Sequence, residues 1–303
     1  MIHVATVHFR DERWVEPQLR YLERFADEEL RVYAFLNGNG PRRHADRFFY
    51  ATSEPIRAHA YKLNLLADVI RFAAPDPNDI LLFLDGDAFP LAPLGATLRP
   101  RLAERPLVAV RRDENNGSPF PHPCFAATTV GFWHEIGGTW HSGDKQHWSD
   151  PAGRPLTDVG ANLLTILKER GVSWHPLLRS NTRELHPLHY AVYGDDAEPV
   201  IVYHHGAGFG ARPGRAFKWE AGHTDARASL LARALDALPR NDLTRKLRRR
   251  YHPVKRLNEE LTRKVKQLDA DVFERLRTDE QFWRDFVDPG AARPSGEPQA
   301  AGD

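Results

Sequence analysis

The sequence has very little cysteine and no long apolar run, and its charges nearly cancel. Cys124 is the only cysteine among 303 residues, so an intrachain disulfide is excluded and a reducing cytoplasm is the expected compartment. No apolar run approaches the roughly 20 residues that a membrane-spanning helix needs. Lys and Arg number 42 against 41 Asp and Glu, so the composition does not indicate nucleic acid as a partner. Residues 1–6 enter strand-like sequence without a basic and then apolar leader, which predicts no secretory signal.

What the sequence does contain is one short apolar stretch that ends in acids. Residues 80–84 are all apolar, and Asp85, Gly86 and Asp87 follow them. Such a run predicts a strand buried on both faces, and ligands bind beyond the carboxyl ends of these strands. In an extended chain the two acids would point the same way, about 6.6 Å apart, with Gly86 leaving room between them. Two like charges that close need a cation, a proton or dispersed solvent, and we favour a divalent metal carrying phosphate; an ordinary Asp-Gly turn is the alternative.

Strands and helices alternate along the first part of the chain. β-forming segments at 2–9, 31–36 and 80–84 are separated by helical patterns at 14–25 and from 53 to 70. This order predicts an α/β fold with a mainly parallel central sheet flanked by helices, as in Rossmann-like proteins.

After residue 90 the pattern becomes less regular. Residues 107–111, 173–178 and 200–203 are further strand candidates, and a helix is expected to open at 157–159. Residues 113–155 are rich in Gly, Pro, His and Trp and have a weak helical pattern. We expect a long ordered loop there, because tryptophans need burial or a ligand.

Composition divides the chain into three parts. Residues 1–222 are expected to form the α/β domain, 223–288 a basic helical C-terminal extension, and 289–303 a disordered tail. Within the extension, Arg240–Lys266 contains eleven Lys or Arg and three acids. A solvated helix face is the commonest reading of such a pattern, peripheral contact with an anionic membrane at its inner face comes next, and nucleic acid comes last.

Four segments together resemble the GT-A glycosyltransferases, the nucleotide-diphospho-sugar transferase superfamily. Residues 83–90, Phe-Leu-Asp-Gly-Asp-Ala-Phe-Pro, resemble the Asp-x-Asp segment of the family, and 60–66 resemble the helix that leads to it. Asp158 resembles the position where many members place an acid that activates the acceptor. Residues 204–208, His-His-Gly-Ala-Gly, are similar to the late histidine-glycine segment of the metal site. The resemblance covers roughly residues 2–210 and does not reach a named subfamily.

The resemblance implies a metal-dependent glycosyltransferase, which moves a sugar from a nucleotide-diphosphate donor to a hydroxyl of a sugar or glycoconjugate acceptor. It implies Mn²⁺ or Mg²⁺ as the cofactor, with Asp85, Asp87 and His205 as ligands, and an imidazole ligand favours Mn²⁺. His205 is preferred to His204 because His205-x-x-Gly208 fits the family spacing. Only one of the two histidines can face the site, because side chains alternate along a strand.

The resemblance also implies which residues hold the substrates. The donor is expected to contact the end of the first strand, the second helix and the acidic segment: Thr6, His8, Arg10, Lys62, Asn64 and Asp85. Lys62 would pair with the diphosphate or the sugar, and a solvated helix lysine is the alternative.

The acceptor side has two candidate features. If the reaction inverts the anomeric carbon, Asp158 would be the general base, although a carboxylate at a helix start could serve as a cap alone. The Trp- and His-rich residues 121–148 are the expected acceptor region, because sugar faces stack on indoles; core packing is the alternative.

Two other functions fit part of the pattern. Phosphatases of the haloacid-dehalogenase type also end an apolar strand with Asp-x-Asp and use the first acid, here Asp85, as a nucleophile. Their motif continues with Gly-Thr, whereas Ala88 and Phe89 follow here. A carbohydrate-binding protein without catalysis is the third reading, and the intact pair of acids counts against it.

Overall fold

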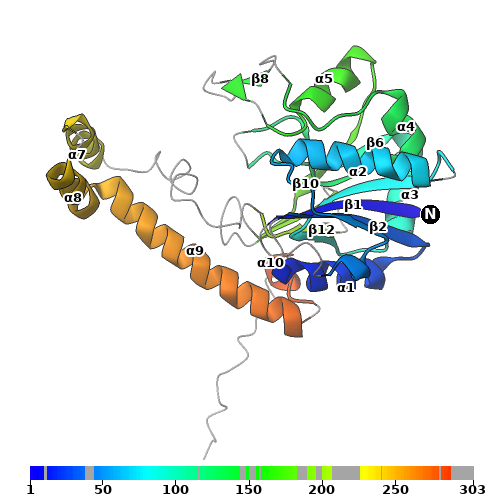
Figure 1. Cartoon of the computed structure of the whole chain (residues 1–303), viewed down its shortest axis with the longest axis horizontal. Coiled ribbons are helices and arrows are strands. Elements are labelled where there is room, and N and C mark those ends of the chain that lie inside the picture. The colour runs from blue at the N-terminus through cyan, green and yellow to red at the C-terminus, as the bar shows by residue number, and fades with distance from the viewer. Residues whose placement is uncertain are drawn as a thin grey trace, which may run out of the picture. The chain divides into compact units, whose positions relative to one another are not determined.

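A computed structural model shows helices around one ten-stranded sheet (Figure 1). The residues it describes are 1–9, 12–37, 44–74, 76–114, 117–143, 148–149, 155–156, 158–182, 190–195, 200–206, 226–239, 241–279 and 281–287.

The first half of the sheet is parallel and follows the predicted alternation of strands and helices. β1 (Ile2–Phe9) lies between β2 (Leu30–Asn37) and β4 (Ile80–Asp85), and β3 (Tyr50–Thr52) pairs with β2 at the edge. β3 is a strand that the sequence patterns did not predict.

Two helices connect these strands. The turn η1 (Glu12–Trp14) leads into α1 (Val15–Phe25), as expected. α2 (His59–Ala73) begins later than the predicted start at Ser53. The difference matters, because it makes His59 the first residue of the helix.

The first five residues of β4, 80–84, are all apolar because helices cover both faces of the strand. Ile80, Leu82 and Leu84 belong to the core cluster that contains residues of α1, whereas Leu81 and Phe83 belong to the cluster that contains residues of α2. Figure 1 shows α1 and α2 on opposite sides of the sheet. Successive side chains of a strand point to opposite faces, so a strand between two helix layers needs apolar residues at every position.

The second half of the sheet is mostly antiparallel. β7 (Pro121–Thr129) pairs antiparallel with both β4 and β6 (Leu107–Arg111). Its segment was expected to lie in a long loop, because residues 113–155 are rich in Gly, Pro, His and Trp and have a weak helical pattern. The α/β architecture flanked by helices is confirmed, and the sheet is mixed.

The far edge of the sheet lies next to the turn that contains Asp85 and Asp87. Beyond β6 the strand order is β10 (His175–Arg179), β11 (Ala191–Gly194), β12 (Val200–His204) and β5 (Ala88–Pro90). Only two residues separate β5 from the end of β4, yet β5 pairs with β12. The carboxyl ends of β4 and β12 therefore lie close together, and this topology positions the site.

The remaining elements of this part are short. They are η2 (Ala45–Arg47), α3 (Leu94–Glu104), α4 (Val130–Glu135), the strand pair β8 (Trp148–Ser149) and β9 (Pro155–Leu156), and α5 (Ala161–Glu169).

Contacts divide the chain into two units. The first comprises Met1–Gly206 and Trp283–Asp303, and the second is Ala207–Phe282. The second unit contains the predicted C-terminal helices, α7 (Ala226–Ala237), α8 (Asp242–Tyr251) and α9 (Pro253–Thr278).

The chain returns to the first unit after α9. There α10 (Arg284–Val287) is joined to the loop after β10, since Thr182 Oγ1 donates to the Phe286 carbonyl oxygen at 3.1 Å. The predicted tail, 289–303, lies outside the described residues. Within the described part of the chain, no helix combines the length and apolar character that a membrane span requires.

Candidate metal centre

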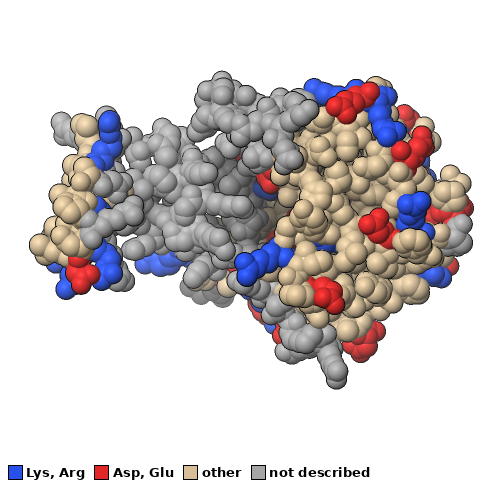
Figure 2. Space-filling model, turned by 45° about the horizontal axis from the view of Figure 1, so that its top comes forward, with Lys and Arg blue, Asp and Glu red and all other residues tan. Residues whose placement is uncertain are grey.

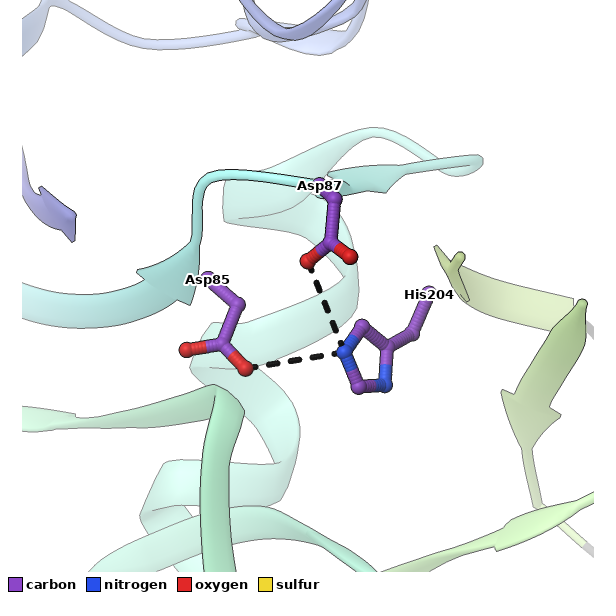
Figure 3. Close-up of side chains that lie close together, drawn as sticks. All are labelled: Asp85, Asp87 and His204. Carbon is purple, nitrogen blue, oxygen red and sulfur yellow. Dashed lines mark ion pairs between the residues drawn. The ribbon is translucent and has the colours of Figure 1, made fainter. Parts of the chain in front are cut away.

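Two carboxylates and an imidazole meet where β4, β5 and β12 come together (Figure 3). Asp85 is the last residue of β4, Asp87 lies in the turn before β5, and His204 is the last residue of β12. His204 Nε2 lies 3.5 Å from Asp85 Oδ2 and 3.6 Å from Asp87 Oδ1. One ligand atom from each residue lies within 4.8 Å of the other two. A single divalent cation can bridge side chains at this spacing.

Strand pairing decides which histidine faces the acids. His204 is paired with Ala88 across β12 and β5, and the backbone N–H of His205 donates to the Asp87 carbonyl oxygen at 3.0 Å. Neighbouring side chains on a strand point to opposite faces. His205 accordingly points away from the acids, with its Nδ1 2.9 Å from Tyr203 Oη.

The structure thus places His204 beside the acids, where the sequence analysis preferred His205. Spacing to a later glycine does not fix the direction of a side chain, whereas the pairing of β12 with β5 does. Gly208, on which that preference rested, lies outside the described residues.

The turn between the two acids is held by a buried glutamine and needs its glycine. Gln18, on the inner face of α1, donates from Nε2 to the carbonyl oxygens of Asp85 at 2.7 Å and Ala88 at 2.8 Å. A Cβ atom at Gly86 would lie 2.6 Å from the Val7 carbonyl oxygen, a distance that real Cβ atoms do not show. The backbone that presents both carboxylates is therefore fixed by its own contacts.

Thr6 and His8 lie beneath this turn. Both are buried, and Thr6 Oγ1 and His8 Nε2 each lie 3.0 Å from Gln18 Oε1. Gln18 Nε2 already donates to two carbonyls, so Oε1 must accept from both residues, and His8 carries a proton on Nε2. This placement makes them supports of the turn, and the predicted contacts of both residues with the donor stay a prediction. Arg10, predicted to lie beside them, falls outside the described residues.

His59 also contacts the site, and the sequence analysis missed it. Its Nε2 lies 3.0 Å from Asp85 Oδ1, so the Asp85 carboxylate has His59 at one oxygen and His204 at the other. In a helix that starts at Ser53, His59 would lie in the second turn and not at the helix start. No local sequence pattern indicated the later start. Gln18 could have been found, because it lies four residues after Trp14 and four before Leu22 on an otherwise apolar helix face.

Burial and mutual contact set the charges of the three side chains. Burial alone would raise the pKa of Asp85, but contacts with His204 and His59 outweigh it and hold that pKa well below its usual range. Burial raises the pKa of Asp87, and the neighbouring charge of Asp85 adds to the effect. Burial would lower the pKa of His204, yet contacts with Cys124, Asp85 and Asp87 raise it to about 10. Without a metal, the positive charge of His204 therefore lies beside the two acids, and His204 would lose its proton on binding a metal.

Polar side chains at the start of β7 lie next to His204. The ring centroids of His122 and His204 are 6.3 Å apart, and His122 Nδ1 accepts the Cys124 N–H at 3.1 Å. Burial, followed by the charge of Arg112, lowers the pKa of His122 well below its usual range. His122 is thus neutral, with its proton on Nε2. Burial raises the pKa of the Cys124 thiol.

Lys62 is a buried cation one helical turn after His59. It is 1% exposed, and its Nζ lies 4.7 Å from the centre of the Phe9 ring. Burial lowers its pKa to about 8. Among the described residues, no carboxylate forms an ion pair with it. The alternative of a solvated surface lysine is therefore wrong, and a desolvated cation of this kind suits an anionic ligand.

Asn64, two residues on, has both ends of its amide engaged by a loop. Its Nδ2 donates to Thr139 Oγ1 at 2.8 Å, and its Oδ1 accepts the Trp140 N–H at 3.0 Å. These contacts position the loop, and the predicted contact of Asn64 with the donor stays a prediction.

Asp158 precedes its helix and does not open it. α5 begins at Ala161, and its N-cap is Gly160, with a left-handed φ of 97°. Asp158 Oδ1 accepts the Val159 N–H at 2.8 Å, and its carbonyl oxygen accepts the Ala161 N–H at 3.2 Å. Its use as a general base stays a prediction.

The tryptophans of the expected acceptor region belong to the core where the structure describes them. Trp133 and Trp140 are 2% and 0% exposed, and their rings lie 4.7 and 5.1 Å from that of Phe83. Core packing is the correct reading for these two, which are not available to stack on a sugar. The side chain of Trp148 lies outside the described part of the chain.

Comparison with known proteins gives no match to a family model and none to a curated protein. Solved structures resemble part of the chain, and two of them are described below. The mannosyltransferase PcManGT from Pyrobaculum calidifontis, in complex with GDP-Man and Mn²⁺, is 18% identical over 45% of this chain and 46% of its own, with a TM-score of 0.34. Residues 1–349 of S. aureus TarS are 10% identical over 45% of this chain and 49% of that one, with a TM-score of 0.33.

The chain spans about half the length of each structure that it resembles. The donor, the acceptor and the metal have to be inferred from the geometry of the site.

Proposed function

We propose that the protein is a metal-dependent glycosyltransferase, which moves a sugar from a nucleotide-diphosphate donor to a hydroxyl of a sugar or glycoconjugate acceptor. The observation that supports it most strongly is the group formed by Asp85, Asp87 and His204, whose ligand atoms lie within 4.8 Å of one another at the carboxyl end of a central strand. That edge of the sheet is where α/β proteins bind their ligands.

The three side chains fit a hard divalent cation. Carboxylate oxygens suit both Mg²⁺ and Mn²⁺, and the imidazole favours Mn²⁺. The raised pKa of Asp87 shows that two buried negative charges are unfavourable without a counter-charge. When bound, the ion supplies Lewis-acid neutralisation of the diphosphate leaving group.

The protein's own residues orient this site and complement the donor. His59 holds one oxygen of Asp85, and Gln18 fixes the carbonyls on either side of the acidic turn. Lys62 offers a buried positive charge, which we assign to the donor phosphates. If the reaction inverts the anomeric carbon, Asp158 would remove the proton from the acceptor hydroxyl; a retaining reaction needs no such base.

The test is turnover of a donor panel by the full chain. The protein is incubated with UDP-, GDP-, dTDP- and CMP-sugars in Mn²⁺, in Mg²⁺ or in excess chelator, and release of the nucleotide is measured. We expect release from one nucleotide class that depends on the metal. Asp87→Asn should abolish it, whereas Asp113→Asn should not, because Asp113 is exposed and pairs only with Arg111 among the described residues.

Two results would contradict the proposal. Release of phosphate from simple phosphomonoesters, lost in Asp85→Asn, would support a phosphatase that uses Asp85 as its nucleophile. Binding of sugars without turnover of any donor would support a carbohydrate-binding protein.

A further inference from the structure

The helices α7 and α8 of the second unit expose far more apolar side chain than a solvated helix pair requires. Six large apolar residues on or directly after these helices are at least 36% exposed: Leu230, Leu231, Leu238, Leu243, Leu247 and Tyr251. Solvated helices place polar residues on their outer face. We call these six residues the α7–α8 apolar surface.

On α8 the exposed residues form one row. Leu243, Leu247 and Tyr251 recur every fourth residue, and they are 68%, 36% and 50% exposed. Residues at this spacing lie on one face of a helix. Thr244, by contrast, is 7% exposed. α8 therefore turns a polar residue inward and its apolar row outward.

Specific polar contacts hold α8 in this orientation. Thr244 and Asn241 form a reciprocal capping box, with Thr244 N–H donating to Asn241 Oδ1 at 2.9 Å and Asn241 N–H to Thr244 Oγ1 at 3.1 Å. Arg248 Nε donates to the Leu235 carbonyl oxygen of α7 at 2.7 Å, and its Nη2 to that of Leu238. The outward direction of the row thus results from satisfied hydrogen bonds.

Positively charged side chains lie beside this row on the surface of α8. Lys246 and Arg250 follow Leu243 and Leu247 by three residues each, so they lie beside the row, and both are exposed. Figure 2 shows the uncharged surface of this unit with Lys and Arg next to it. The surrounding sequence, Arg240–Lys266, has eleven Lys or Arg against three acids. An apolar row edged by cations complements a surface that offers negative charge above hydrocarbon.

We propose that the α7–α8 apolar surface docks on an anionic phospholipid bilayer, with α8 lying in the plane of the interface. The apolar row would enter the boundary between headgroups and acyl chains, and Lys246 and Arg250 would contact the anionic headgroups. Of the three readings of the basic segment, this structure favours the membrane, because a solvated face does not account for the exposed leucines. The inference does not depend on glycosyl transfer.

The test is co-sedimentation of the full chain with vesicles of phosphatidylcholine alone or mixed with phosphatidylglycerol, without metal or nucleotide. We expect binding to the mixed vesicles only, weakened by added salt. The double variant Leu243→Gln/Leu247→Gln should reduce partitioning at least tenfold, because two apolar anchors are lost. Lys246→Gln and Arg250→Gln should each reduce it about fivefold. The matched control is Phe72→Gln, which removes an 88% exposed residue of α2 and should have no effect.

The alternative partner for the α7–α8 apolar surface is a second copy of the chain. Light scattering on the protein without vesicles would detect such a dimer. A dimer that the leucine variant converts to monomer would overturn the proposal, and so would equal recovery on both vesicle types or unchanged binding of the leucine variant. All of the substituted residues are exposed, so folding is preserved in each variant, which circular dichroism would verify.

Discussion

Replacing Lys62 by methionine should make the protein more stable and at the same time weaken donor binding. In the folded chain, burial lowers the pKa of Lys62 from 10.5 to about 8. Each pKa unit corresponds to 1.36 kcal/mol, so keeping the charge buried at neutral pH costs about 3 kcal/mol of folding free energy. The loss of the contact with the Phe9 ring offsets about 1 kcal/mol of this. Lys62→Met should therefore raise the free energy of unfolding at pH 7 by about 2 kcal/mol.

The dependence on pH has a definite sign. Below the folded pKa of about 8, Lys62 is protonated in both states, and the full cost is present. Between about 8 and 10.5 the unfolded chain binds more protons than the folded one, so the wild-type protein gains stability as pH rises. The advantage of the methionine variant should accordingly shrink across this window.

Urea denaturation at pH 7 and at about pH 10 measures both effects. Lys168→Met is the matched control, because Lys168 is exposed on α5, and its unfolding free energy should change by less than about 0.5 kcal/mol at either pH. Calorimetric titration with the nucleoside diphosphate that the donor panel identifies should show affinity for Lys62→Met reduced at least tenfold, as expected for a lost charged hydrogen bond. A Lys62→Met variant that is less stable than wild type at pH 7, with the same deficit at high pH, would refute this reasoning.

Two further predictions concern the acidic turn. Gly86→Ala should destabilise the protein by about 1–3 kcal/mol and weaken metal binding, because the added Cβ would lie 2.6 Å from the Val7 carbonyl oxygen. Thermal unfolding measures the first effect and Mn²⁺ titration the second. A variant with unchanged stability and unchanged metal affinity would contradict the inference that contacts confine this turn. Gln18→Leu should lose about 1–3 kcal/mol for the unsatisfied carbonyls of Asp85 and Ala88. That loss should be larger than for Gln267→Leu, whose amide bonds an exposed carboxylate on α9, and equal losses in the two variants would contradict the role of Gln18.

Local sequence patterns predicted the features of the site that depend on neighbouring residues. The apolar run ending in Asp85 and Asp87 identified a strand buried on both faces, because burial on two faces leaves a continuous apolar signature. Features set by distant pairing were missed. β7 occupies the centre of the sheet despite its two prolines, because its pairing partners on both sides are remote in sequence.

The histidines illustrate the same limit. The choice of His204 over His205 follows from the register of β12 against β5, which no spacing along the chain encodes. His59 reaches Asp85 only because α2 begins six residues after the predicted start at Ser53. The proposed role of Lys62 stays a prediction, and its burial could not be inferred from the sequence, because lysines on helices are usually solvated.

The most direct test of the metal centre is a titration of Mn²⁺ into the full chain and into variants of two neighbouring histidines. The paramagnetic resonance signal of the free ion measures how much Mn²⁺ each protein binds. His204→Gln should lower the affinity for Mn²⁺ at least tenfold, as Asp87→Asn should, because each removes one of three ligands. His205→Gln should keep the wild-type affinity while lowering the melting temperature, since it loses its contact with Tyr203. Loss of Mn²⁺ binding in His205→Gln with retention in His204→Gln would contradict the geometry on which the proposed function depends.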